Sequence, residues 1–250
     1  MNFSEKLKKG FGWDLMGSLI KQIAILLVTL FLARILGPEE FGIIGMAMVF
    51  VSLSQVFVDI GFTQGLIQNK KNNQRIYSSV FYVNIILGLI VSIILFLSSG
   101  LIGNFYDLTK VESIIKWLCV LPLIGSSCAV QKSRILKKMD FKTLAFATIL
   151  SALVGGFIGI IFAYYRFGVY ALVAQQISSA LIFSFYLWYK ERWLPSLLFS
   201  YTEIKGILNF SIYVFFDNLL RTFFNKLDTL FIGKSFSAIS LGYYSRAESI

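Results

Sequence analysis

Five of the ionisable residues that lie within long apolar segments of the chain are candidates for a functional site. They are Lys21, Asp59, Asp217, Arg221 and Asp228. A charged side chain is costly in hydrocarbon and usually faces a bundle interior or a water-filled cavity. Two deep cations repel each other unless something anionic lies between them, and a phosphate-bearing ligand can exchange with neighbouring carboxylates. We therefore predict that Lys21 and Arg221 bind an anionic substrate, with the three aspartates as counter-ions or coupling-ion sites.

Polar stripes accompany these charges on three of the segments. At about 100° per residue, each stripe covers roughly 80–100° of helix surface. The polar residues that we predict to line a cavity beside the charges are Asp14, Ser18, Gln22, Gln55, Asn218 and Asn225. Lys21 and Asp59 each fall about 13–15 Å from the cytoplasmic boundary, so they are placed to pair. One polar face on each of three helices predicts a shared water-filled cavity; the alternative is that buried ion pairs help the helices to pack.

The composition places these segments in a membrane. Hydrophobic residues make up 57% of the 250-residue chain, charged residues 14%, and the mean hydropathy is +0.75, which leaves too little polar surface for a soluble globule. A hydrocarbon core of about 30 Å needs roughly 20 apolar residues as helix, and the apolar runs exceed the roughly 10-residue strands of a barrel. We predict an all-α polytopic membrane bundle. Its spans are expected at about 11–36, 41–67, 76–103, 112–131, 142–165, 168–189 and 204–233, with an eighth beginning near 239.

The basic residues predict the orientation of these spans. With the N-terminus in the cytoplasm, fourteen of the 23 lysines and arginines fall in cytoplasmic segments and four in outside turns. Cytoplasmic loops of membrane proteins carry such an excess of positive charge. We therefore interpret the net charge of +10 as a topology signal and predict no nucleic-acid partner.

Missing residue types exclude several kinds of chemistry. The chain has no histidine, which excludes histidine acid–base catalysis, Ser-His nucleophiles and imidazole metal ligands from these residues. Cys119 and Cys128 fall on one predicted helix, on opposite faces and about 13 Å apart along its axis, so they cannot bridge each other. No glycine-rich phosphate loop follows a strand. We predict no catalytic residues, no cofactor and no metal site, and hence no enzyme in this part of the chain.

The fifth predicted span carries a face of small residues. These are Ser151, Gly155, Gly159 and Ala163, which recur every four positions. Small residues let helix backbones approach closely in membranes. We predict close packing against a neighbouring helix on this face, and no chemistry.

Two stretches of the chain repeat at an offset of 200 residues. The matching pairs are TLFLAR at 29–34 with TLFIGK at 229–234, Phe41-Gly42 with Leu241-Gly242, and Lys21 with Arg221. Six predicted spans separate the copies, so both run in the same direction, as in transporters built from parallel repeats. The repeat predicts that the two cations face each other across a pseudo-twofold cavity near the bilayer midplane.

A series of short motifs follows one another in order along the whole chain. They read LARILGPEEFG from 32, DIGFTQGLIQ at 59–68, RILKKMDFK at 134–142, FGVYALV at 167–173, LPSLLFS at 194–200, LDTLFIGK at 227–234 and LGYYSRA at 241–247. In this order they resemble the polysaccharide-biosynthesis flippases, the Wzx-type members of the MOP exporter superfamily. No single motif is specific, and the likeness lies in their order.

The resemblance implies a fold and a function. It implies two six-helix lobes, of which residues 1–200 would form the first and residues 201–250 the start of the second, truncated after span seven and part of span eight. It implies a multi-pass protein of the bacterial inner membrane that moves an undecaprenyl-diphosphate-linked oligosaccharide to the outer leaflet by alternating access. The product would enter O-antigen, capsule or exopolysaccharide, with a polysaccharide polymerase and a chain-length regulator as partners beside membrane lipid. The resemblance implies a cationic central cavity. This chain differs from that pattern, because its spans hold nearly as many acidic as basic residues.

Three other functions compete with this interpretation. A cation-coupled multidrug exporter of the same superfamily would use the deep carboxylates, but the fixed charge of Lys21 would repel a cationic drug. A membrane scaffold for polymer-synthesis enzymes would have no use for charges at this depth. A membrane-bound glycosyl- or acyl-transferase lacks histidine here and lacks a sizeable loop for a catalytic site.

Overall fold

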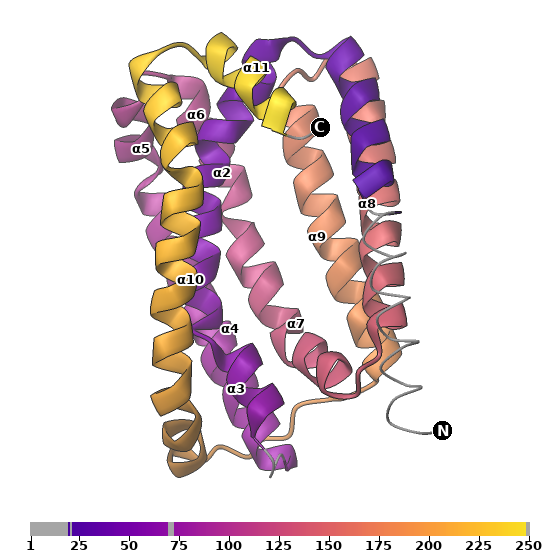
Figure 1. The fold of residues 1–250 in the computed structure, drawn as a ribbon, viewed down its shortest axis with the longest axis vertical. Helices are drawn as coiled ribbons and strands as arrows, with labels where there is room; N and C mark the ends of the chain where they lie inside the picture. The colour runs from indigo at the N-terminus through magenta and orange to yellow at the C-terminus, as the bar shows by residue number, and fades with distance from the viewer. Residues whose placement is uncertain (1–19, 21, 70–72, 249–250) are drawn as a thin grey trace.

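The computed structural model describes residues 20, 22–69 and 73–248, and all of its regular structure is helical within these ranges. The first described helix is Gln22–Ile35. The others are α2 (Pro38–Asp59), α3 (Phe62–Gln68), α4 (Gln74–Leu97), α5 (Ser99–Phe105), α6 (Thr109–Leu118), α7 (Val120–Lys137), α8 (Phe141–Tyr164), α9 (Tyr170–Glu191), α10 (Tyr201–Ser235) and α11 (Ala238–Glu248). They form an elongated bundle (Figure 1). The predicted all-α fold class is confirmed.

Among the described residues, five segments are long and apolar enough to cross a membrane, and α10, at the predicted span 204–233, is not one of them. The five are Pro38–Gln68, Gln74–Leu97, Thr109–Lys137, Phe141–Tyr164 and Tyr170–Glu191. Large apolar side chains point outward from them, such as Leu97 at 73% and Phe185 at 72% exposure. A soluble protein does not cover its surface in this way, whereas lipid tails solvate such side chains. The chain is therefore a multi-pass membrane protein, as the composition predicts.

Several spans that were predicted as single continuous helices are interrupted in the structure. The span at 41–67 is interrupted at Ile60 and Gly61, which both have positive φ and separate α2 from α3. The span at 76–103 is divided at Ser98, between α4 and α5. The span at 112–131 begins earlier, is divided at Cys119, and continues to Lys137. The length of an apolar run predicts how many residues lie in hydrocarbon. A local break in the helix hardly changes the hydropathy of the run, so hydropathy does not predict such breaks.

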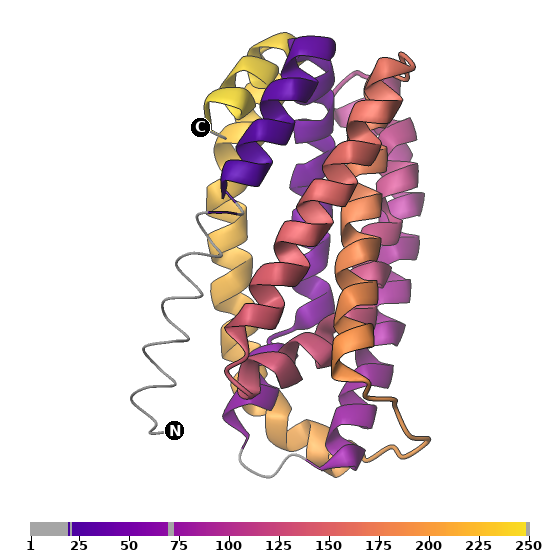
Figure 2. The same ribbon diagram turned by 90° about the vertical axis from the view of Figure 1, so that its right-hand side faces the viewer.

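The small-residue face of α8 packs closely against α9, as predicted. These two helices lie side by side along their length (Figure 2). A Cβ atom added at Gly155 would come within 2.9 Å of the backbone oxygen of Gln175, and one at Gly159 within 2.9 Å of the Gln175 side chain. Ser179 Oγ donates a hydrogen bond of 3.1 Å to the carbonyl of Ser151. Glycine is needed at both positions because the two backbones are almost in contact.

A cluster of ion pairs around a buried carboxylate links several helices at the lower end of the bundle in Figure 1. The Glu191 carboxylate, whose side chain is 3% exposed, lies 2.6 Å from Arg134 Nε and 2.7 Å from Lys138 Nζ. The Arg134 guanidinium also lies 4.7 Å from the ring centroid of Tyr77 and 5.6 Å from that of Trp193. The cluster therefore ties the end of α7 to the end of α9, to α4 and to the segment that leads to α10.

Glu191→Gln is expected to lower the free energy of unfolding by about 3 kcal/mol, because it leaves two cations without their buried carboxylate. The measurement is the apparent Tm of the purified protein in detergent. Glu112→Gln is the matched control, since Glu112 forms an exposed i,i+4 pair with Lys116 at 2.6 Å that contributes less than about 0.5 kcal/mol. Equal Tm values for the two variants would show that the cluster does not stabilise the bundle.

The starts of α2 and α11 cross in reciprocal contact at the upper end of Figure 1. A Cβ atom added at Gly42 would lie 1.7 Å from the carbonyl oxygen of Ala238, and one added at Gly242 would lie 1.7 Å from that of Pro38. Pro38 and Ala238 are separated by 200 residues, as are the two glycines. In such an isologous contact each copy offers the same surface to the other. The geometry therefore supports the internal repeat predicted at this offset.

Candidate functional site

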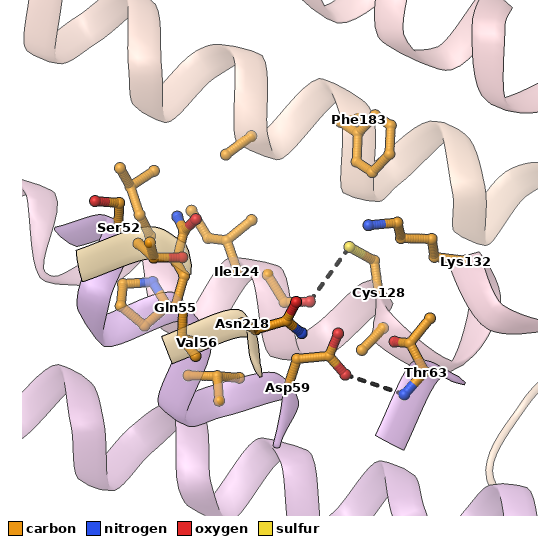
Figure 3. Close-up of a pocket in the computed structure, with 17 residues that line it drawn as sticks. Ser52, Gln55, Val56, Asp59, Thr63, Ile124, Cys128, Lys132, Phe183 and Asn218 are labelled. Carbon is orange, nitrogen blue, oxygen red and sulfur yellow. Dashed lines mark hydrogen bonds between the residues drawn. The ribbon is translucent and has the colours of Figure 1, made fainter. Parts of the chain in front are cut away.

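A cavity of about 470 Å³ lies between five helices in the lower half of the bundle. We call it the central cavity, and Figure 3 shows it in close-up. Its lining comes from α2, α3, α7, α9 and α10, and comprises Ser52, Gln55, Val56, Val58, Asp59, Thr63, Leu121, Pro122, Ile124, Gly125, Cys128, Ala129, Lys132, Ala180, Phe183, Asn218 and Thr222. Its volume is in the range of small-molecule sites, and a few polar groups converge in an apolar wall, which is typical of a binding pocket.

The break between α2 and α3 places Asp59 in this cavity. Ile60 has φ 28° and Gly61 φ 74°, so the chain turns directly after Asp59. The Asp59 carboxylate then accepts a hydrogen bond of 3.0 Å from the backbone N–H of Thr63 (Figure 3). An acceptor near a helix N-terminus satisfies an N–H group that has no partner within the helix. Asp59 thus has a structural role at the start of α3 as well as a position in the cavity.

Two contacts from neighbouring helices fix α3 beside the cavity. Ser211 Oγ on α10 donates a hydrogen bond of 3.1 Å to the carbonyl of Gly61. At the other end of α3, Lys137 Nζ donates to the carbonyls of Leu66 and Asn69. The Lys137 bonds go to carbonyl groups at the C-terminal end of α3, where a helix has no N–H partners of its own to offer. Helix α3, whose Thr63 N–H bonds the Asp59 carboxylate, is therefore held by both α7 and α10.

Lys132 on α7 extends its side chain into the central cavity, which Asp59 also lines (Figure 3). Its charge attracts the carboxylate, yet it forms no hydrogen bond and no ion pair within 4 Å with any other residue that the structure describes. The Lys132 side chain is exposed to the cavity. A cation held near a carboxylate without direct contact can accept an anionic group between them.

Lys132 was not among the site residues predicted from the sequence. The predicted spans place this lysine in a cytoplasmic loop, because the basic residues at 132–142 follow the predicted end of the span at 131. The structure instead continues α7 to Lys137. A signal was present, since residues 126–138 contain no glycine and no proline that would end a helix.

The polar residues of α10 separate into two groups. Asn218 lines the central cavity together with Thr222, one turn further along. Asp217 and Arg221 pair with each other at 3.4 Å, with side chains 64% and 70% exposed, and do not line the cavity. Asn225 is exposed and also lies outside its lining.

Other predicted site residues are distributed along the bundle. Asp228 accepts a hydrogen bond of 3.3 Å from the Tyr244 hydroxyl on α11. Gln55 lines the central cavity beside Asp59. Gln22 is exposed at the start of the first described helix and does not line the cavity. Asp14, Ser18 and Lys21 lie outside the described residues, so the predicted pairing of Lys21 with Asp59 stays a prediction.

A protein-family comparison decides where this chain belongs. The sequence model of a family described as polysaccharide biosynthesis protein matches residues 31–250. The chain is a member of this polysaccharide biosynthesis family. The match covers every described helix from α2 to α11, including all residues that line the central cavity.

Curated relatives of the family match at low identity over most of the chain. The teichuronic acid biosynthesis protein TuaB of Bacillus subtilis (strain 168) is 25% identical over 79% of this chain and 41% of its own length. The succinoglycan biosynthesis transport protein ExoT of Rhizobium meliloti (strain 1021) is 26% identical over 72% and 36%. The lipopolysaccharide biosynthesis protein WzxC of Escherichia coli (strain K12) is 22% identical over 100% and 51%. The chain thus spans about half or less of the length of these relatives. No solved structure matches the chain.

Proposed function

We propose that this member of the polysaccharide biosynthesis family works as part of a flippase. Its substrate would be an undecaprenyl-diphosphate-linked oligosaccharide, moved from the inner to the outer leaflet of the bacterial cytoplasmic membrane during synthesis of a surface polysaccharide. The observation that carries the proposal is the central cavity, which Lys132 and Asp59 both line without direct contact, inside a bundle whose outer surface is apolar. The printed name of one relative, a succinoglycan biosynthesis transport protein, supports transport as the general function.

The diphosphate is the part of this substrate that the cavity charges would recognise. In the empty state, Asp59 attracts Lys132 and limits the cost of a cation inside the bundle. An entering diphosphate would take the place of that carboxylate and receive charge-assisted hydrogen bonds from the lysine. Lys21 and Arg221 would contribute further positive charge, with Asp217 and Asp228 as counter-ions or coupling-ion sites. Gln55 and Asn218 would donate hydrogen bonds to the same substrate from the cavity wall.

Movement would take place between the two parts of the chain. Residues 1–200 would form one lobe, and residues 201–250 would begin the second. The reciprocal α2–α11 crossing lies between them and is a candidate pivot. Transporters built from repeats expose a central site to each side in turn by rocking one repeat against the other. In the orientation predicted from the basic residues, the N-terminus is cytoplasmic and the α2–α11 crossing lies on the outer side.

The position of Lys132 also separates this proposal from the drug-exporter alternative. A fixed positive charge in the cavity repels a cationic drug and attracts a phosphate. A scaffold without transport would not need the cavity. The expected partners are the lipid-linked oligosaccharide, membrane lipid, and the polymerase and chain-length regulator that act after the flipping step; no nucleic acid and no enzyme activity are included in the proposal.

Complementation tests the proposed function. In cells that lack their own copy, the full chain is expected to restore surface polysaccharide, whereas Lys21→Ala and Arg221→Ala each reduce it about tenfold, as expected for loss of one charge-assisted contact in a solvated position. Lys205→Ala is the control, because Lys205 is exposed at the start of α10 away from the cavity. Polysaccharide is quantified at the surface and protein in the membrane fraction. Normal surface polysaccharide in both Lys21→Ala and Arg221→Ala would refute the role of these two cations.

A further inference from the structure

Two adjoining hollows lie on the flank of the bundle, at the end opposite to α3 and away from the central cavity. The lateral groove, of about 580 Å³, is lined mainly by apolar side chains of α6, α8 and α9, including Trp117, Phe162, Ile177 and Leu181. The head pocket, of about 380 Å³, contains Glu39, Glu40, Lys110 and Arg166. Phe167 and Tyr170 line both hollows, so the two are continuous.

The length of the lateral groove matches one leaflet of a bilayer. Along α9 it extends from Tyr170 to Leu181, which is about 16 Å at the rise of an α-helix and about half of a 30 Å hydrocarbon core. Trp117 and Tyr170 lie on its wall, and such aromatic residues concentrate near membrane interfaces. The groove therefore has the depth and the lining of a site for one acyl chain.

The charges of the head pocket are balanced but only partly paired. Lys110 Nζ lies 3.3 Å from Glu39 Oε1. Within the described part of the chain, Arg166 and Glu40 have no side-chain hydrogen bond and no ion pair. One guanidinium and one carboxylate thus remain available in the same pocket.

The backbone holds Arg166 in a conformation that arginine rarely adopts. It ends α8 at φ 60°, and its N–H donates a hydrogen bond of 3.0 Å to the carbonyl of Ala163. Glycine or asparagine usually occupies such a left-handed position after a helix. This conformation fixes where the Arg166 side chain leaves the backbone, at the edge of the head pocket.

We propose that the head pocket and lateral groove bind a zwitterionic phospholipid with an ethanolamine head group. Its phosphate would accept hydrogen bonds from Arg166, its ammonium group would donate to Glu40, and one acyl chain would lie in the lateral groove. An anionic lipid without an amine would place its phosphate near Glu40 with nothing to compensate the carboxylate. A choline head group has no N–H to donate. This site is separate from the central cavity and does not depend on the flippase proposal.

Native mass spectrometry of the purified full chain with added lipid tests this site. Dioleoyl phosphatidylethanolamine is expected to bind at least about fivefold more tightly than dioleoyl phosphatidylglycerol, and Arg166→Gln or Glu40→Gln is expected to remove that preference. Arg192→Gln is the matched control, since Arg192 also ends a helix at positive φ, at 48°, and is exposed at the other end of the bundle. Ala174→Phe fills the groove without touching the charges and is expected to weaken both lipids equally.

The outcomes distinguish the head group from the groove. Retention of the preference in Arg166→Gln and Glu40→Gln would overturn the proposal, as would tighter binding of phosphatidylglycerol to the unchanged protein. An equal loss in Arg192→Gln would show that the arginine effect is nonspecific and would also contradict it. Size-exclusion profiles verify that each variant is folded, and a misfolded Arg166→Gln is replaced by Arg166→Lys, which keeps the charge and is expected to keep part of the preference.

Discussion

Gly42→Ala and Gly242→Ala are each expected to prevent accumulation of folded protein. The added Cβ atom would lie 1.7 Å from a backbone carbonyl oxygen in both cases, that of Ala238 for the first and that of Pro38 for the second. Both obstacles are backbone atoms on helix N-termini, so no side-chain rotation relieves the clash, and the α2–α11 crossing has to open. Overpacking of a tight contact typically costs about 1–3 kcal/mol, and a clash with backbone lies at or beyond the upper limit. Because the contact is reciprocal, the two substitutions should have similar effects.

Membrane abundance and the apparent Tm in detergent measure this effect. Gly206→Ala is the matched control, because Gly206 lies in α10 and a Cβ atom added there has no heavy atom within 4 Å. Alanine is favoured over glycine within a helix by about 1 kcal/mol, so this control should be unchanged or slightly more stable. Normal abundance and Tm for Gly42→Ala would show that the crossing is not as close as described.

Lys132→Gln is expected to reduce surface polysaccharide about a hundredfold while the protein accumulates normally. A charge-assisted hydrogen bond contributes about 1.5–3 kcal/mol, which corresponds to roughly tenfold to hundredfold in affinity or rate. The upper end applies because Lys132 lines the central cavity together with Asp59, whereas Arg221 lies outside the cavity lining and is paired with Asp217. Stability should change little, since Lys132 has no hydrogen bond to lose among the described residues.

Two further variants separate charge from shape at this position. Lys132→Arg keeps the positive charge and should retain most of the export, while Lys205→Gln removes an exposed lysine of α10 and should retain all of it. The readouts are surface polysaccharide and protein in the membrane fraction. Full export by Lys132→Gln would exclude a role of this lysine in substrate recognition.

The fold class was predictable because hydropathy alone determines it. Apolar runs of this length must be helical and must lie in lipid, and the segments that contain α4, α8 and α9 agree with the predicted spans to within a few residues. The small face of α8 was also predictable, since Gly155 and Gly159 recur at the period that places them side by side. The breaks were not, because Ile60 gives no local signal for its positive φ.

The candidate site was predictable only in part. Asp59 and Gln55 could be recognised as polar residues in an apolar segment, and they line the central cavity. Lys132 belongs to a cluster of basic residues that is typical of a loop. Only the continuation of α7 to Lys137 shows that it lines the same cavity as Asp59. Helix periodicity placed Asp217, Asn218 and Arg221 on one face. It cannot distinguish the part of that face that lines the central cavity from the part that remains exposed.

Transport of a lipid-linked diphosphate oligosaccharide by the purified full chain in liposomes tests the central claim most directly. The quantity measured is the rate at which a labelled oligosaccharide becomes accessible in the opposite leaflet. The account predicts transport by the unchanged protein, a rate about a hundredfold lower for Lys132→Gln, and a near-normal rate for Lys132→Arg. Equal rates for the unchanged protein and Lys132→Gln would contradict it.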